Sequence, residues 1–167
     1  GRPLPRRPWP DPLPSDVDLD AVVAAATAAS PATGPGRDQD PDGPPVRPTV
    51  PIALADDPDA QAQYPMGWVP EDGNLIVYGI GGSGTTTTLA TLALSLAGSR
   101  TADEAHLYVV DVGARELEAL GVLPHVGAVI TAAERERQVR LVRTLRDELG
   151  RRRRMGLAGV DELPMIV

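Results

Sequence analysis

The residues of this chain best suited to chemistry are the glycines and hydroxyl side chains between positions 79 and 86. They follow a short apolar run, Leu75–Tyr78, and precede the helical pattern Thr85–Ala97. A glycine turn between a strand and a helix lets consecutive backbone N–H groups converge on an anion, and the helix dipole adds positive charge at the same point. This segment therefore predicts a phosphate-binding site.

The loop sequence, GIGGSGTT, matches two phosphate-binding motifs. As G-x-x-x-x-G-K-[ST] it is a P-loop in which Thr85 stands at the lysine position and Thr86 at the position that holds Mg²⁺. As G-x-G-x-x-G, formed by Gly79, Gly81 and Gly84, it is the fingerprint of a dinucleotide site. A tight turn that binds no ligand is the third interpretation.

Two further observations bear on the choice between the two motifs. A dinucleotide site needs an acidic residue about 20 residues further on for the ribose, whereas Asp111 comes 27 residues after Gly84. The hydroxyl groups of Thr85–Thr88 directly follow the last glycine, as a P-loop requires. From the residues alone, both nucleotide classes stay open.

The elements that must position this loop are predicted by apolar runs and turn residues. Strands alternate with helices after residue 49, so we expect a three-layer α/β domain with a mainly parallel sheet. Leu163–Val167 has the composition of a further buried strand, and we expect the sheet to be completed by residues outside this chain. The other expected strands are Val50–Asp57, Tyr64–Pro70, Leu75–Tyr78, His106–Asp111 and Val126–Ile130; the expected helices are Val17–Ala29, Thr85–Ala97, Glu116–Leu120 and Glu134–Arg154.

Details of three of these helices are also predicted. Ser15 or Asp16 is expected to cap the first helix. Gly98 is expected to follow the end of the second helix, which buries Leu89, Leu92 and Leu96. The long helix opens at the capping-box pair Thr131 and Glu134 and is expected to bury Val139, Val142, Leu145 and Leu149.

The first third of the chain differs in composition from the rest. Proline alternates with other residues in Gly1–Pro14, which favours an extended segment, and Ser30–Pro48 is rich in Pro, Gly and Asp. We therefore divide the chain into residues 1–48, an interdomain strap with a short helix near 17–29, and residues 49–167, the N-terminal part of an α/β module.

Composition excludes several classes of site. The chain has no cysteine and only two histidines, so a disulfide framework or a thiolate metal site is excluded, and any metal is expected to arrive with a nucleotide. The net charge of -7 argues against nucleic-acid binding by the whole surface. No apolar run approaches the roughly 20 residues that span a bilayer, and we expect this piece to be soluble.

Three stretches carry a resemblance to a known family: LIVYGIGGSGTTTTLATLALSLA, HLYVVDVGARELEALGVLPHVGAVI and an arginine-rich helix ending in RRRR. They resemble the FtsK/SpoIIIE-type P-loop ATPases, and most closely one ATPase module, the second or third, of the EccC motor of type VII secretion systems. In that family the loop commonly reads G-x-x-x-S-G-K-[ST]-T. The next strand ends in an Asp-x-Gly-Gly-like turn, here Asp111–Ala114, and Leu-Pro-His-Val-Gly follows, here Leu123–Gly127. The resemblance is most specific over Gly73–Val129.

This resemblance implies ATP and Mg²⁺ as ligands and the fold of a P-loop NTPase. The residues that it assigns to the nucleotide are Gly79, Ile80, Gly81, Gly82, Ser83, Gly84, Thr85, Thr86 and Thr87, with Thr86 also on Mg²⁺. Thr85 replaces the lysine that bridges the phosphates, and no residue is assigned a catalytic role. We therefore expect a degenerate, regulatory module that binds ATP with little or no hydrolysis.

The resemblance also implies partners. These are neighbouring ATPase modules of the same polypeptide, further copies in rings of six, membrane components of the secretion complex, and small secreted helical-hairpin proteins with a C-terminal signal. The segment Glu134–Arg154 holds nine arginines and four acidic residues. It is a solvated helix, a DNA contact, or an intermodule surface. In the last case Arg151 or Arg152 of this helix, or Arg115 before it, reaches a neighbouring nucleotide. A DNA translocase and a dinucleotide-dependent oxidoreductase are the alternative functions.

Overall fold

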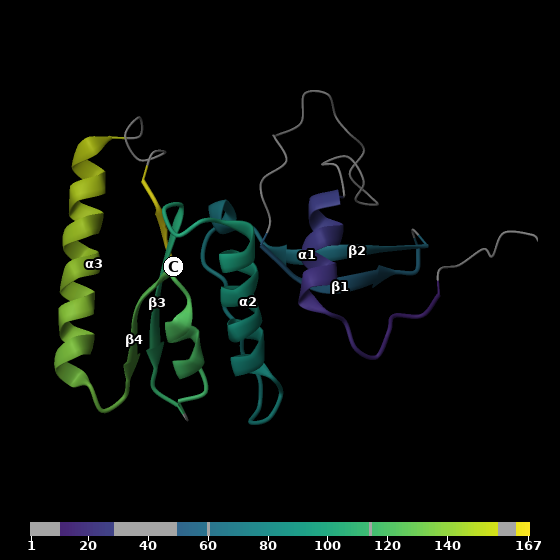
Figure 1. The fold of residues 1–167 in the computed structure, drawn as a ribbon, viewed down its shortest axis with the longest axis horizontal. Coiled ribbons are helices and arrows are strands. Elements are labelled where there is room, and N and C mark those ends of the chain that lie inside the picture. The colour runs from purple at the N-terminus through teal and green to yellow at the C-terminus, as the bar shows by residue number, and fades with distance from the viewer. Residues whose placement is uncertain (1–10, 29–49, 60, 114, 157–162) are drawn as a thin grey trace, which may run out of the picture. The chain divides into compact units, whose positions relative to one another are not determined.

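The computed structural model describes residues 11–28, 50–59, 61–113, 115–156 and 163–167. The chain divides into two units, Gly1–Ile80 and Gly81–Val167 (Figure 1). The predictions for residues 1–10 and 30–48, which form most of the expected strap, lie outside the described residues. None of the described helices combines the length and apolar character needed to cross a membrane.

The first unit is a β-hairpin covered by one helix. Strands β1 (Val50–Asp57) and β2 (Ala62–Trp68) pair antiparallel, and helix α1 (Leu19–Ala28) packs against both. Its buried residues among those described are Val22 on the helix and Val50 and Pro51 on the first strand, so burial of apolar surface between helix and hairpin holds the unit together. The expected helix and both expected strands are thus present.

The cap of α1 differs from the predicted one. Asp18, rather than Ser15 or Asp16, precedes the helix, and its Oδ1 accepts a hydrogen bond from the backbone N–H of Asp20 at 3.0 Å. Ser15 and Asp16 bond to each other instead. Asp18 is the capping residue because it directly precedes the first apolar residue of the helix, where its carboxylate can reach the free N–H groups of the first turn.

The hairpin requires glycine at position 67. The pairing slips between Pro51 and Ala53, and this bulge brings the backbone of Val50 close to Gly67. A Cβ atom built on Gly67 would lie 2.0 Å from the carbonyl oxygen of Val50. That atom belongs to the backbone and cannot turn away as a side chain could, so residue 67 must lack a side chain.

A Gly67→Ala variant is therefore expected to lose about 1–3 kcal/mol of unfolding free energy through this overpacking. Gly98→Ala is the matched control, because a Cβ there meets no atom within 4 Å. Gly98 lies inside a helix, so that change is expected to add about 0.5–1 kcal/mol. Urea unfolding followed by circular dichroism measures both variants, and equal midpoints for the two would contradict the close approach.

The segment between the hairpin and the glycine loop is not a strand, contrary to prediction. A short 3₁₀ helix, η1 (Pro70–Asp72), ends at Gly73, whose carbonyl accepts a hydrogen bond from the Trp68 indole N–H at 2.8 Å. The apolar run Leu75–Tyr78 follows without regular structure, and Ile76 is 78% exposed. A strand forms only where a neighbour bonds its backbone N–H and C=O groups, and no described strand pairs with this run.

The second unit contains a three-stranded parallel sheet between two helices. The strand order is β4–β3–β5, formed by β3 (Ala105–Asp111), β4 (Val126–Thr131) and β5 (Met165–Ile166). Helices α2 (Thr85–Ser99) and α3 (Arg135–Met155) lie on opposite sides of it, and the 3₁₀ helix η2 (Glu118–Val122) follows β3 (Figure 1). The predicted three-layer α/β arrangement with a parallel sheet is confirmed.

The core of the second unit lies mainly between α2 and the sheet. Its most buried apolar residues are Leu92, Ala93, Leu96, Ala105, Leu107, Leu117, Leu120, Ile130 and Leu141. Leu89, predicted to be buried, is exposed. Gly98 lies inside α2 rather than after it, because the helix continues to Ser99 and closes with the bond from Arg100 N–H to the Leu96 carbonyl.

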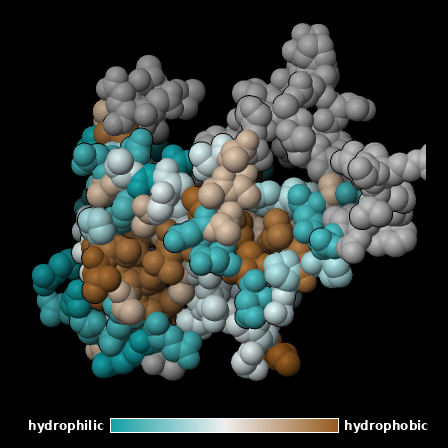
Figure 2. All heavy atoms as spheres, turned by 45° about the vertical axis from the view of Figure 1, so that its right-hand side comes forward, coloured by the Kyte–Doolittle hydropathy of each residue, from teal (hydrophilic) through white to brown (hydrophobic). Residues whose placement is uncertain are grey.

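Helix α3 turns a different face toward the sheet from the one predicted. Leu141 is buried, whereas Val139, Val142 and Leu149 are exposed. The positions that face inward follow the spacing 141, 145, 148 and 152, so a glutamate and an arginine share the inner face with two leucines. Figure 2 shows hydrophobic areas on the surface of the chain, bordered by hydrophilic residues.

Candidate phosphate-binding loop

The glycine loop forms a turn that only glycine adopts easily. Gly82 and Gly84 have positive φ angles of 79° and 85°, in the left-handed region that other residues seldom occupy. Gly84 is the N-cap of α2, and its carbonyl accepts the bond from Thr88 N–H at 2.8 Å. Residues 79 and 80 belong to the first unit, whereas residues 81–87 of the loop belong to the same unit as α2 and the parallel sheet.

Donor groups are free in the first turn of α2. Within the described part of the chain, neither the backbone N–H groups nor the hydroxyl groups of Thr85, Thr86 and Thr87 make a hydrogen bond. The hydroxyl of Thr88, in contrast, donates to the carbonyl of Gly84 at 3.0 Å. A glycine cap has no side-chain acceptor, so these N–H groups remain available to an anion. The residues present thus fit a phosphate group, and the Thr86 hydroxyl fits a Mg²⁺ ligand.

Helix α2 itself brings no side-chain charge to this anion site. Helix α2 has the sequence TTTTLATLALSLAGS, without a single ionisable residue. What the helix itself offers at its start is the N–H groups and the helix dipole, equivalent to roughly half an elementary charge. The half-buried Thr85 can donate one neutral hydrogen bond where a P-loop lysine supplies a full charge.

The first turn of α2 lies at the carboxyl edge of the sheet. The other end of the helix is tied to the amino edge, because His125, which directly precedes β4, donates from Nε2 to the carbonyl of Arg100 at 2.8 Å. Fifteen helical residues span about 22 Å, close to the length of the seven-residue strand β3, so the helix runs back along that strand. Open α/β sheets bind their ligands at the carboxyl edge.

Asp111, at the carboxyl end of β3, closes the loop that follows the strand. It is buried, and its two carboxylate oxygens accept the backbone N–H groups of Gly113 at 2.9 Å and Leu117 at 3.1 Å. Sequence reasoning considered this residue as a ribose ligand and as the start of an Asp-x-Gly-Gly-like turn, but assigned it no hydrogen bonds to the backbone. The Asp-x-Gly spacing, typical of a side chain that bonds backbone two residues on, was the signal for its role in the loop.

The loop closed by Asp111 presents Arg115 to solvent. Arg115 is one of two described non-glycine residues with positive φ, at 64°, and its side chain is 62% exposed beside Glu118, 3.7 Å away. A non-glycine residue with positive φ has a strained backbone that the surrounding structure must stabilise, and such residues cluster at functional sites. Arg115 is available to an external anion.

The other two predicted arginines lie elsewhere. Arg151 and Arg152, near the end of α3, both donate to the carboxylate of Glu148, and Arg152 also donates to the carbonyl of Pro164. The structure therefore does not bring the three predicted intermodule arginines together in one cluster. Sequence reasoning missed Glu148, although its spacing of three and four residues from the arginines indicates helical ion pairs.

The predicted pair at the start of α3 is present in altered form. The Glu134 carboxylate accepts both the backbone N–H of Thr131 at 2.9 Å and its hydroxyl at 3.0 Å, while Glu134 itself is the N-cap. The Thr131 N–H, the guanidinium of Arg137 and the Thr131 hydroxyl lower the pKa of Glu134 from 4.5 to about 2. The carboxylate therefore joins the end of β4 to α3.

A Glu134→Gln variant is expected to be less stable than the natural chain near neutral pH, with the difference shrinking in acid. Glu134 stays ionised in the folded chain down to about pH 2 but titrates near 4.5 when unfolded. Its contribution is complete above about pH 4.5 and is lost as the pH falls toward 2. Urea midpoints over this range measure it, with the exposed Glu136→Gln as control; a difference independent of pH would contradict the assignment.

The parallel sheet flanked by helices, with a glycine-capped helix start at its carboxyl edge, defines an α/β domain of the P-loop nucleotide-binding class. The chain belongs to the FtsK/SpoIIIE family, because the model of that family matches residues 47–163. The resemblance drawn from the loop and the two following segments is confirmed.

The relatives of this chain are secretion proteins. It is 33% identical over 105 residues to the ESX secretion system protein EccC of Geobacillus thermodenitrificans, 31% to YukB of Bacillus subtilis and 30% to the type VII secretion system protein EssC of Staphylococcus aureus. Each match covers 62% of this chain and 7% of the relative. The chain thus spans a small part of these proteins.

Two solved structures have a similar fold. The cytoplasmic domain of EssC matches with a TM-score of 0.61 and 28% identity over 70% of this chain and 25% of that one. EssC ATPases 2 and 3 of Geobacillus thermodenitrificans match with a TM-score of 0.62 and 28% identity over 74% of this chain and 29% of that one. The predicted P-loop ATPase fold agrees with both.

Proposed function

We propose that this chain is part of a regulatory ATPase module of a type VII secretion motor, which binds ATP and Mg²⁺ through residues 79–87 with little or no hydrolysis. The observation that carries the proposal is the start of α2, where backbone N–H groups are free and the helix itself contributes no cationic side chain. Such a loop can hold phosphates through its backbone. It lacks the charge that stabilises phosphoryl transfer.

The missing cationic side chain at position 85 is expected to reduce turnover more than binding. A hydrogen bond to a charged group contributes about 1.5–3 kcal/mol, or roughly 10- to 150-fold in affinity, and Thr85 cannot make one from a cationic donor. The developing charge of the transition state depends more strongly on such a group than ground-state binding does. The module is therefore a nucleotide sensor for its neighbours.

The decisive experiment measures binding and turnover in the same preparation. Calorimetry with ATP and Mg²⁺ is expected to show weak binding, and a phosphate-release assay no turnover above the rate without protein. Substantial turnover would overturn the regulatory assignment. Binding of NAD but not ATP would instead favour the dinucleotide-dependent oxidoreductase.

The proposal includes partners. Neighbouring ATPase modules of the same polypeptide, further copies of it, membrane components of a secretion complex and secreted helical-hairpin proteins with a C-terminal signal would engage this module in the cytoplasm. Arg115, exposed in the loop that Asp111 closes, is the arginine best presented to a neighbouring nucleotide. Its replacement by alanine is expected to leave ATP binding by this chain unchanged.

DNA translocation is the second candidate, and the arginines of α3 are the observation that favours it. Arg143, Arg153 and Arg154 make no ion pair with any described residue. Binding of duplex DNA that strengthens as salt is lowered would support this candidate, because phosphate contacts release counterions. We expect no binding, since the chain carries a net charge of -7.

A further inference from the structure

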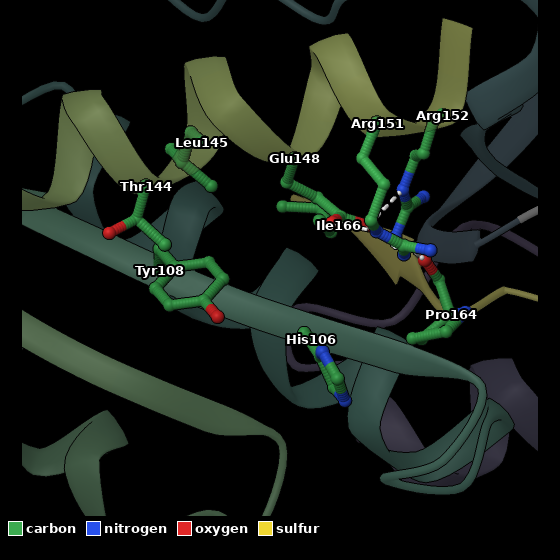
Figure 3. Close-up of a pocket in the computed structure, with 9 residues that line it drawn as sticks. All are labelled: His106, Tyr108, Thr144, Leu145, Glu148, Arg151, Arg152, Pro164 and Ile166. Atoms are coloured by element: carbon green, nitrogen blue, oxygen red, sulfur yellow. Dashed lines mark hydrogen bonds and ion pairs between the residues drawn. The ribbon is translucent and has the colours of Figure 1, made fainter. Parts of the chain in front are cut away.

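A cavity of about 280 Å³ lies between the last turns of α3 and the sheet, away from the phosphate-binding loop. Figure 3 shows His106 and Tyr108 of β3 on one side of it, and Leu145, Glu148 and Arg151 of α3 on the other. At ~30 Å³ per water molecule, its volume equals that of about nine waters. It has room for one small organic molecule.

This cavity is at the opposite edge of the sheet from the loop. His106 is the second residue of β3 and pairs with Ile166 of β5, whereas Asp111 ends the same strand. Five residues of strand separate His106 from Asp111, which is about 16 Å. A ligand in the cavity would therefore not compete with a nucleotide for space.

One end of the cavity is cationic. The Glu148 carboxylate accepts Nε and Nη2 of Arg151 at 2.7 and 2.6 Å, and Nε of Arg152 at 2.7 Å. These two guanidinium groups lower the pKa of Glu148 to about 2, so the three side chains together carry one net positive charge. Each guanidinium has five N–H donors, and the described bonds leave donors free on both.

The other end of the cavity is apolar with a hydroxyl. Figure 3 shows Leu145 and the ring of Tyr108 at this end, Ile166 also lines the cavity, and the Tyr108 hydroxyl makes no hydrogen bond within the described part of the chain. Glycine at position 127 allows this ring position, since a Cβ there would lie 2.7 Å from Cε1 of Tyr108. The ring therefore lies across β4 and forms one wall of the cavity.

We propose that this cavity binds a small carboxylate with an aromatic or branched aliphatic body, at a site separate from the nucleotide loop. The apolar body lies against Leu145 and Ile166, and the carboxylate bonds the free N–H groups of Arg151 and Arg152. The net positive charge beside an apolar wall selects this chemistry, because it complements an anion better than a neutral or cationic ligand. The carboxylate can belong to a free acid or to the last residue of a peptide.

The test compares phenylacetate with phenylacetamide, which has nearly the same shape without the charge. Ligand-observed NMR titration of the unaltered chain is expected to show the acid binding at least tenfold more tightly than the amide, with no change on adding ATP and Mg²⁺. Equal affinities, no binding of the acid, or displacement by the nucleotide would each overturn the proposal. A second titration uses N-acetylleucine, which resembles the last residue of a peptide. Tighter binding of N-acetylleucine than of phenylacetate would indicate a peptide terminus, and the reverse order a free acid.

Two variants on the same helix locate the site. Arg151→Gln is expected to weaken phenylacetate binding at least tenfold, whereas Arg153→Gln, which removes an equal charge outside the cavity, is expected to leave it within twofold. Equal losses in both variants would show a diffuse charge effect and overturn the proposal. Gly127→Ala displaces the Tyr108 ring and is expected to weaken the binding of phenylacetate and of phenylacetamide by the same factor. This variant therefore tests the shape of the cavity, whereas Arg151→Gln tests its charge.

Discussion

Replacing Thr85 by lysine is expected to increase the affinity for ATP by roughly 10- to 150-fold, because it restores a cationic hydrogen-bond donor at the phosphate site. Thr85 begins α2 directly after the left-handed Gly84, so a longer side chain there starts from the position that a P-loop lysine occupies. The backbone N–H groups of the turn are already free. The substitution thus supplies the cationic donor that the loop lacks and leaves the turn intact.

The matched control for this gain is Leu94→Lys. It adds the same charge to an exposed position on the same helix, about two and a half turns further on. Calorimetry with ATP and Mg²⁺ is expected to show tighter binding for the lysine at position 85 only, and the thermal midpoint of that variant is expected to rise with ATP concentration. An unchanged affinity in Thr85→Lys, or equal gains in both variants, would mean that residues 79–87 do not hold the phosphates.

The parts of the fold that sequence reasoning predicted correctly are those whose signal is local. The strands Ala105–Asp111 and Val126–Thr131 were predicted as His106–Asp111 and Val126–Ile130, from nearly all-apolar runs that are typical of parallel strands covered on both sides. The start of α2 was predicted from glycine followed by threonines, because that order serves both the turn and the helix. The nucleotide contacts of this loop remain predictions.

The predictions that were wrong concern segments whose structure depends on contacts with residues distant in the sequence. Leu75–Tyr78 has the composition of a strand but no described neighbour to complete its hydrogen bonds. In α3, counting apolar residues alone missed that Glu148 and Arg152 face inward as an ion pair, which leaves Val142 and Leu149 outside. Periodicity identified this helix but could not fix which side of it faces the sheet.

Replacing Asp111 is expected to cause a large loss of stability in the second unit. Asp111→Ala removes both acceptors: it leaves the buried N–H group of Leu117 without a partner, at a cost of about 1–3 kcal/mol, and releases the N–H group of the exposed Gly113 to water. Asp111→Asn keeps the shape and one acceptor, but its amide N–H₂ faces a second N–H group. We therefore expect it to lose about half as much as the alanine variant.

Urea unfolding measures these losses, with the exposed Asp103→Asn as the control that removes the same charge elsewhere in this unit. Amide hydrogen exchange adds a local readout, because only the Asp111 variants are expected to lose protection at Gly113 and Leu117. Unfolding midpoints equal to that of the control would contradict the role of the carboxylate. If the Asp111 variants lost stability but kept protection at both amides, the defect would lie elsewhere in the unit. Protection lost at both amides would show that the buried carboxylate holds in place the loop that carries Arg115.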